Sequence, residues 1–250
     1  MDEDPATGET LAVCALGSRE DVDAAVAAAR AAQPDWAALD PARRARILHA
    51  LARLIEEHAG ELAETESRDV GKPISEATTR DLPFTIGTWE YYAGWPTKIL
   101  GTTNPAAPGV FTATVREPLG VCAVITPWNF PLTIASWKIA PALACGNAVV
   151  HKPAPEAPLT ALRLAELALE AGVPEGVLSV VTGDAETGAA LAEHPDVDSL
   201  SFTGSGYNLL FGNAMPHRTA GHYRRAGPRA STHRRCRPHR AEPPSLEILS

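Results

Sequence analysis

The residue with the clearest chemical potential is an asparagine enclosed by aromatic and proline neighbours. Asn129 lies between Trp128 and Phe130, and Pro127 and Pro131 flank this trio. The prolines restrict the local backbone, and we expect the two aromatic rings to exclude water. A rigid amide donor in dry surroundings suits the stabilisation of an oxyanion. An asparagine in a turn can also serve only to satisfy backbone groups, so this alternative stays open.

A second set of candidates consists of ligand-binding positions. Lys152 is followed by Pro153, and a lysine fixed at a strand end suits ribose hydroxyls or a phosphate. Gly183 and Gly188 flank a turn into a helix, where backbone N–H groups can approach a ligand, although glycines there commonly serve the turn itself. Residues 203–205 (Thr-Gly-Ser) offer hydroxyl and backbone donors that could cradle a pyrophosphate. The usual G-x-G-x-x-G fingerprint is absent.

Alternating strands and helices position these candidates. We expect strands at 121–125, 148–151, 177–181 and 200–202, and helices at 134–143, 158–169 and 187–192. This order predicts an α/β fold with a parallel sheet covered on both faces. Ligands in such sheets bind outside the carboxyl ends of the strands. Most of the candidate residues follow such ends, which indicates one shared site.

The N-terminal part reads as helices followed by an extended arm. Ser18 with Asp21 predicts a capping box, and Asp40-Pro41 predicts the start of a second helix whose apolar stripe reaches Leu62. A third helix is expected from about residue 74 to 92. Residues 99–115 contain the turn signal Pro108-Gly109 and alternate in polarity afterwards, which indicates an arm or hairpin.

Composition limits the classes of partner. Residues 1–205 carry 14 Lys and Arg against 28 Asp and Glu, so nucleic acid is not the expected partner. The four cysteines show no spacing typical of a metal site or a disulfide framework, so we expect no metal. The acidic N-terminus lacks an apolar signal core, and no apolar run approaches the roughly 20 residues that span a bilayer. We therefore expect a soluble, cytoplasmic protein without a membrane partner.

Short motifs follow one another along most of the chain. In order they are Asp4-Pro5-Ala6-Thr7-Gly8-Glu9, Gly71-Lys72-Pro73, Arg116-Glu117-Pro118-Leu119-Gly120, Pro127-Trp128-Asn129-Phe130-Pro131, Pro141-Ala142-Leu143 with Gly146-Asn147, Lys152-Pro153-Ala154 and Phe202-Thr203-Gly204-Ser205. In type, order and spacing they resemble the NAD(P)-dependent aldehyde dehydrogenase superfamily over residues 4–205.

The resemblance assigns roles residue by residue. Asn129 would stabilise the thiohemiacetal oxyanion of an aldehyde substrate. The cofactor, NAD or NADP, would contact a set of residues that includes Lys152 as the ribose-binding position. This set is Ile125, Trp128, Lys152, Ala154, Gly183, Gly188 and Ser205. In that family a cysteine thiolate attacks the aldehyde, hydride passes to nicotinamide, and a glutamate-activated water releases the acid.

The chain also departs from the family pattern. The ribose-binding glutamate expected three positions after Lys152 is replaced by Pro155, with Glu156 one residue later, which leaves NAD versus NADP open. The glycine expected after Ser205 is Leu209, and neither a Glu-Leu-Gly-Gly segment nor a glycine-flanked cysteine follows. Cys14, Cys122 and Cys145 read as packed residues. Cys236 stands among arginines that would lower its pKa, but no expected element aims it.

Residues 206–250 differ from the rest in composition. They contain eight Arg, no Lys and two Glu, with abundant Pro and His. A nucleic-acid tail, disorder without a role, and a shifted reading frame of a GC-rich gene are three interpretations, and the abrupt change inside a motif favours the third. Translation of the gene in its other two frames would test it. We expect a disordered tail.

Together these observations predict an incomplete Rossmann-like dinucleotide-binding domain of aldehyde dehydrogenase type. We expect an N-terminal helical part (1–98), an oligomerisation-type arm (99–118), a cofactor-binding core (119–205) and a basic tail (206–250).

The expected reaction is aldehyde oxidation with NAD(P)⁺, in a family that forms homo-oligomers. Since the nucleophile and base are missing, these 250 residues should not turn over. The alternative is a non-catalytic NAD(P)-binding or subunit-interaction fragment. Loss of later strands should also expose a sheet edge.

Overall fold

The centre of the fold is a five-stranded sheet in a computed structural model that describes residues 2–204 and 221–223. The strand order is β7-β6-β5-β8-β9. Its strands are β5 (Val121–Ile125), β6 (Ala148–Lys152), β7 (Leu178–Val180), β8 (Ser199–Phe202) and β9 (Gly221–Tyr223). The first four are parallel to one another, whereas β9 runs antiparallel to β8. Every residue of β5 and β6 is buried, as expected for parallel strands covered on both faces.

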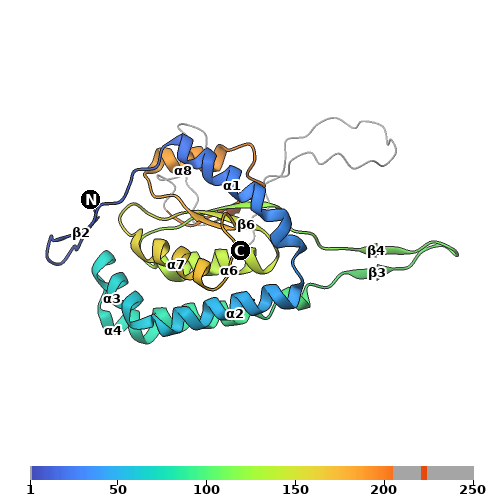
Figure 1. Ribbon diagram of the computed structural model, residues 1–250, viewed down its shortest axis with the longest axis horizontal. Coiled ribbons are helices and arrows are strands. Elements are labelled where there is room, and N and C mark those ends of the chain that lie inside the picture. The colour runs from blue at the N-terminus through green and yellow to red at the C-terminus, as the bar shows by residue number, and fades with distance from the viewer. Residues whose placement is uncertain (1, 205–220, 224–250) are drawn as a thin grey trace.

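Helices cover the two faces of this sheet. In Figure 1, α1 (Arg19–Ala38) and α8 (Ala185–Glu193) lie on one side, and α6 (Pro131–Ala144), α7 (Leu159–Glu170) and α2 (Pro41–Glu57) lie on the other. Successive side chains of a strand point to opposite faces. Val121 and Ala123 accordingly pack in the core that contains Val22 and Val26 of α1. Val124 packs in the second core with residues of α2, α6 and α7. The predicted doubly covered parallel sheet is confirmed.

The predicted helix starts are confirmed by their caps. The Ser18 side chain accepts from the backbone N–H of Asp21, whose carboxylate accepts from Ser18 N–H at 2.8 Å. Asp40 accepts from Arg43 N–H at 3.0 Å, and Pro41 takes the first helical position. The end of the second helix differs from prediction. The second helix ends before His58, so Leu62 belongs to α3 (Ala59–Val70).

The helix expected from residue 74 contains an irregular turn. It comprises α4 (Ile74–Glu76), a π-helical segment (Ala77–Asp81) and α5 (Leu82–Ala93). Helical spacing of apolar residues could not reveal the π turn, because one extra residue in a turn alters the pattern only slightly. The turn places the buried carboxylate of Asp81 toward the body of the molecule. A short 3₁₀ turn (Pro96–Lys98) follows α5.

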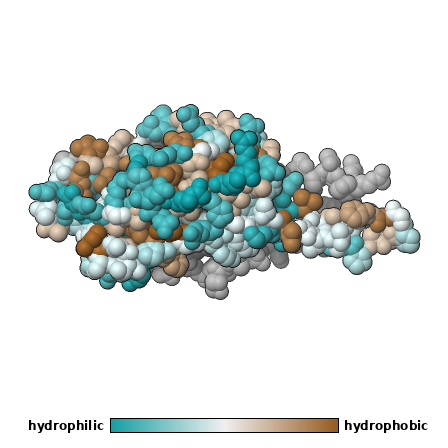
Figure 2. Space-filling model, turned by 60° about the horizontal axis from the view of Figure 1, so that its bottom comes forward, coloured by the Kyte–Doolittle hydropathy of each residue, from teal (hydrophilic) through white to brown (hydrophobic). Residues whose placement is uncertain are grey.

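Two antiparallel hairpins lie outside the central sheet. Near the N-terminus, β1 (Asp2–Glu3) pairs with β2 (Thr10–Ala12). The second hairpin pairs β3 (Thr102–Asn104) with β4 (Thr112–Thr114), and it extends away from the body as an arm (Figure 1). All residues of both arm strands are exposed, and apolar and hydrophilic residues occur side by side along the arm (Figure 2). The predicted hairpin at 99–115 is confirmed, and its role in assembly stays a prediction.

The end of the described chain adds a strand at one edge of the sheet. β9 pairs with β8 through the partners Leu200 and Tyr223, so the outer edge of β8 is covered. β9 is the last strand in the order, so the edge of the sheet expected from the loss of later strands lies at β9, and a strand inside the predicted tail was not foreseen. Ser205, Leu209, Cys236 and most of the predicted tail lie outside the described residues. Within the described residues, no helix is long and apolar enough to cross a membrane.

Candidate functional site

The carboxyl ends of the parallel strands meet at one edge, as predicted. Ile125, the last residue of β5, is the register partner of Lys152 on β6 and of Phe202 on β8. Backbone bonds continue this alignment into the loops. Thr126 N–H donates to Lys152 O at 3.3 Å, and Thr203 N–H donates to Ile125 O at 3.1 Å. The loop that carries Asn129 thus begins directly beside the lysine, and Ser205 follows just beyond the described part of the chain.

Lys152 is a buried cation, with 6 % of its surface exposed. Burial lowers the pKa of its ammonium group, and the nearby carboxylates of Glu156 and Asp184 partly oppose this shift. Its Nζ forms no hydrogen bond or ion pair with any other residue that the structure describes. A desolvated ammonium with unused donors is well suited to hydroxyl or phosphate oxygens of a ligand.

Gly188 leaves space beside both strand ends. A Cβ atom placed on Gly188 would lie 3.9 Å from Ile125 Cδ1 and 3.9 Å from Lys152 Cδ. Three predicted cofactor positions, two on strands and one on α8, are therefore adjacent. Ala154 is also buried, and its carbonyl accepts from Ala157 N–H at 3.2 Å in the loop after β6. This space and the free ammonium fit an extended ligand with polar oxygens.

Gly183 has a packing explanation. A Cβ atom there would come within 2.1 Å of Thr187 Oγ1, so only glycine allows Thr187 to approach. The start of α8 is also already capped, because Asp184 Oδ1 accepts from Glu186 N–H at 2.9 Å and from Thr187 N–H at 3.4 Å. The Asp184 carboxylate therefore satisfies these two N–H groups, whereas cofactor binding at Gly183 stays a prediction.

The loop with Asn129 is open, contrary to the expected dry setting. Asn129 is exposed, and Trp128 has 54 % of its surface exposed, so the aromatic neighbours do not shield the amide from water. The rings diverge, since Phe130 turns toward Lys72 and Arg80 whereas Trp128 faces solvent. The Asn129 side chain forms no hydrogen bond to another described residue. Its N–H donors are therefore available to a ligand.

His151 is a buried residue that was not among the predicted site residues. Its Nε2 lies 2.9 Å from Thr126 Oγ1, which ties the end of β6 to the first residue of the Asn129 loop. Burial lowers the pKa of His151 to about 3, and the charges of Lys152 and Lys138 add to this effect. The imidazole is thus neutral at ordinary pH. A histidine directly before the candidate lysine was the signal that could have drawn attention to it.

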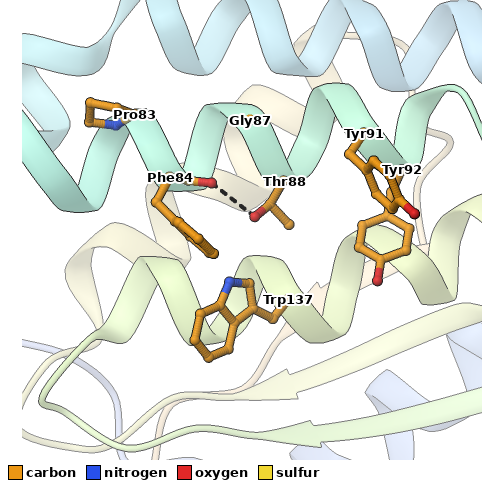
Figure 3. Close-up of a pocket in the computed structure, with 7 residues that line it drawn as sticks. All are labelled: Pro83, Phe84, Gly87, Thr88, Tyr91, Tyr92 and Trp137. Atoms are coloured by element: carbon orange, nitrogen blue, oxygen red, sulfur yellow. Dashed lines mark hydrogen bonds between the residues drawn. The ribbon is translucent and has the colours of Figure 1, made fainter.

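An aromatic hollow of about 480 Å³ lies between α5 and α6. In Figure 3, Phe84 from α5 points toward Trp137 from α6, and their ring centroids are 5.4 Å apart. The hollow is lined by Pro83, Phe84, Gly87, Thr88, Tyr91, Tyr92 and Trp137. Phe84, Thr88 and Tyr91 recur at helical spacing on the open face of α5, and this spacing is visible in the sequence. Trp137 lies on α6 and Asn129 lies in the loop directly before α6, so the hollow and Asn129 are close in the sequence.

The described cysteines are free thiols with raised pKa values. Burial raises the pKa of Cys122 to about 12, and burial followed by the charges of Asp2 and Asp69 raises that of Cys14. Cys145 is exposed as a residue, yet partial burial of its sulphur still raises its pKa, against the opposing charge of Arg44. None of these three is predisposed to form a thiolate. Cys236 lies outside the described residues.

Known proteins share this architecture. Residues 2–208 match the aldehyde dehydrogenase family. An aldehyde dehydrogenase from Bacillus cereus, solved as its NAD⁺ complex, is 47 % identical with a TM-score of 0.80, over 82 % of this chain and 42 % of that one. A gamma-glutamyl-gamma-aminobutyraldehyde dehydrogenase from Burkholderia cenocepacia J2315 is also 47 % identical, with a TM-score of 0.80, over 81 % and 42 %. An indole-3-acetaldehyde dehydrogenase in its apo form is 43 % identical, with a TM-score of 0.80, over 81 % and 47 %. The chain therefore spans less than half of the length of these structures.

Proposed function

Because the chain belongs to the aldehyde dehydrogenase family, we propose that it forms the NAD(P)-binding part of an enzyme that oxidises an aldehyde to a carboxylic acid. The observation that carries the proposal is the alignment of Ile125 and Lys152 at the carboxyl edge of the sheet, beside the space left by Gly188. This edge is where open α/β sheets bind ligands. The NAD⁺ complex of the Bacillus cereus relative supports the same class of cofactor.

Different residues of this edge would contact different parts of the cofactor. Lys152 would donate to ribose hydroxyls, because its buried ammonium forms no hydrogen bond to another described residue. Ile125 and Gly188 would form an apolar wall with room for a flat ring. Trp128 and Ala154 extend the predicted contacts, and Gly183 and Ser205 remain predicted positions of the same set. When bound, the nicotinamide cofactor supplies the hydride acceptor.

Asn129 would stabilise negative charge on the substrate oxygen. Its exposed side-chain N–H₂ is a donor without a hydrogen bond inside the described chain. One well-placed donor of this kind supports roughly 3–4 kcal/mol of transition-state stabilisation when water is excluded. The aromatic hollow at Phe84 and Trp137 would contact the apolar part of the aldehyde. Exclusion of water from Asn129 would then require substrate and further protein segments.

On their own, these 250 residues are proposed to bind cofactor without turnover. The described thiols have raised pKa values, so they are poor nucleophiles at neutral pH. This observation favours a second candidate function, a non-catalytic NAD(P)-binding fragment that assembles through the arm at 99–118. Three free cysteines in the described part support a reducing compartment such as the cytoplasm.

Calorimetric titration with NAD⁺ and NADP⁺, combined with absorbance assays at 340 nm on several aldehydes, tests the proposal. We expect saturable binding of at least one cofactor and no reduction of it. Absence of binding to the folded chain would contradict the proposed function. Turnover that Asn129→Ala abolishes would instead show that these residues suffice for catalysis, and the fragment proposal would be wrong.

A further inference from the structure

Phe130, which follows Asn129, is contacted by two cations from a distant part of the chain. Lys72 Nζ lies 4.7 Å from the centroid of the Phe130 ring, and Arg80 Cζ lies 5.4 Å from it. Both distances fall within the range of cation–π attraction, which strengthens when the cation is desolvated. The Lys72 side chain is only 10 % exposed, whereas that of Arg80 is 58 % exposed. Lys72 is therefore the stronger contact.

A shared carboxylate orients both cations. Asp81 Oδ2 lies 2.7 Å from Lys72 Nζ, and Asp81 Oδ1 lies 3.2 Å from Arg80 Nε. Asp81 is buried at the end of the π-helical segment, a type of irregular turn that is frequent at functional sites. The Asp81 carboxylate therefore holds the two cations, Lys72 and Arg80, against the Phe130 ring.

A second buried carboxylate connects Lys72 to the start of α6. Glu66 Oε1 lies 2.8 Å from Lys72 Nζ, and the residue is fully buried. Burial raises the pKa of Glu66, while Lys72 and the backbone N–H of Leu132 favour its charged form. Glu66 Oε2 forms no hydrogen bond within the described chain, so the interaction of this carboxylate with Leu132 N–H is electrostatic. Negative charge at a helix N-terminus is favourable, and α6 begins directly after Phe130.

The network contacts the chain at two points just after Asn129. The Phe130 ring contacts Lys72, and the backbone N–H of Leu132, in the first turn of α6, interacts with Glu66. Asn129 itself forms no side-chain hydrogen bond to a described residue, so its neighbours must set its position. We propose that Lys72 is a positioning residue, which holds the Phe130 ring and the start of α6 and thereby orients the Asn129 amide. The value of this orientation for catalysis rests on the proposed function.

Stability alone gives little reason for such a cluster. Buried ion pairs are often no more stabilising than apolar residues of similar volume, because both charges lose their hydration. An apolar pair in place of Lys72 and Glu66 would fill the same interior. It would not provide a cation above the Phe130 ring or a negative charge at the start of α6. The cluster therefore contributes geometry that apolar packing lacks.

Fluorine NMR of the full 250-residue chain labelled with 5-fluorotryptophan tests the proposal. The chain has five tryptophans, and Trp128, next to Asn129, reports the loop, with its signal assigned by Trp128→Phe. Trp36 and Trp89 are fully buried and report the fold. We expect Lys72→Met and Phe130→Leu each to split the Trp128 line or to broaden it at least twofold, with the Trp36 and Trp89 lines unmoved. Phe130→Tyr keeps an aromatic face, so its Trp128 line should stay single and narrow as in the wild type.

Matched substitutions elsewhere serve as controls. Lys98→Met and Phe111→Leu make the same chemical changes at exposed positions and should leave the Trp128 line unchanged. An unchanged Trp128 line in Lys72→Met or in Phe130→Leu overturns the proposal. A split or broadened Trp128 line in Phe130→Tyr overturns it as well. If Lys72→Met displaces the Trp36 and Trp89 lines, the double variant Lys72→Met with Glu66→Gln replaces it, and the same criteria apply. Since no cofactor is added, a chain that fails to bind NAD(P)⁺ would contradict the proposed function but not this result.

Discussion

Ile125 and Lys152 are register partners at the last positions of β5 and β6, and the missing side chain of Gly188 leaves space next to both. The strand register fixes the first two, and the packing of α8 on the sheet brings the third. Rigid elements therefore hold these three residues, whereas Asn129 lies on a loop. We expect cofactor binding to be robust to changes in the loop and sensitive to changes at this edge.

Substitutions at Gly188 distinguish the effect of lost space on cofactor binding from the effect on helix stability. Gly188→Ala adds a Cβ atom in ordinary van der Waals contact with Ile125 and Lys152, so it should be tolerated. Since alanine is the better helix former, the free energy of unfolding should rise by up to about 1 kcal/mol. Gly188→Leu would fill the space and should weaken NAD(P)⁺ binding at least tenfold. Denaturant unfolding and calorimetric titration measure the two effects, and equal affinity of Gly188→Leu and wild type would contradict the assigned site.

Lys152 should contribute to cofactor binding and not to stability. Lys152→Met removes a buried ammonium whose pKa burial lowers, so the free energy of unfolding at pH 7 should be unchanged or higher. The lost hydrogen bonds from a charged donor should weaken cofactor binding by about tenfold to a hundredfold. Lys98→Met, at an exposed position, is the matched control for both measurements. A variant that loses stability as well as affinity would indicate a structural role instead.

Local sequence patterns predicted the framework of this site well. Ser18 and Asp40 identified the starts of α1 and α2, and the run 121–125 identified β5 with the correct ends. These signals depend on neighbours in the chain, namely caps and short apolar runs. The convergence of strand ends could also be predicted, because parallel strands with helical crossovers must bring their carboxyl ends to one edge.

Contacts between distant segments could not be predicted in the same way. The exposure of Asn129 depends on what covers the loop, and no local pattern encodes this. The ring of Phe130 meets Lys72 and Arg80 from a distant segment, and Arg80 lies in a π turn, a detail of backbone hydrogen bonding that apolar spacing does not encode. The capping of α8 by Asp184 was visible in the sequence, since aspartate is a preferred cap, and we read only the glycines beside it.

Glu156 should bias the chain toward NAD⁺ over NADP⁺. Its carboxylate and that of Asp184 both act on the charge of Lys152, so an added ribose phosphate would meet negative potential. Glu156→Gln should therefore improve the affinity for NADP⁺ relative to NAD⁺ by about threefold to tenfold, more at low salt than at high salt. Glu170→Gln, an exposed change at the end of α7, is the matched control. Competitive titration with both cofactors measures the ratio, and an unchanged ratio would show that Glu156 lies too far from the ribose to act.

Lys138 should make the stability of the chain depend on alkaline pH. It lies on α6 with its Nζ 2.8 Å from Ser201 Oγ, and burial lowers the pKa of Lys138 from 10.5 to about 8. Between these values the unfolded state binds a proton that the folded state has released. The contribution of Lys138 to the free energy of unfolding therefore rises with pH across this window, by at most about 1.4 kcal/mol per pH unit. Below pH 8 the lysine is charged in both states, and burial of that charge is a constant penalty.

Lys138→Met removes both the penalty and its pH dependence. The variant should be more stable than wild type at pH 7, and the difference should shrink as the pH rises from about 8 toward 10.5. Burial raises the pKa of Cys122, so its contribution to the free energy of unfolding falls as the pH rises above the ordinary thiol pKa of 9.0. Comparing the two proteins at each pH cancels this opposite contribution. Urea unfolding at pH 7, 8, 9 and 10 provides the comparison, with Lys98→Met as the control that should show no such trend. A constant difference from pH 7 to pH 10 would mean that Lys138 keeps an ordinary pKa because water reaches it, and that α6 seals the sheet less tightly than the structure indicates.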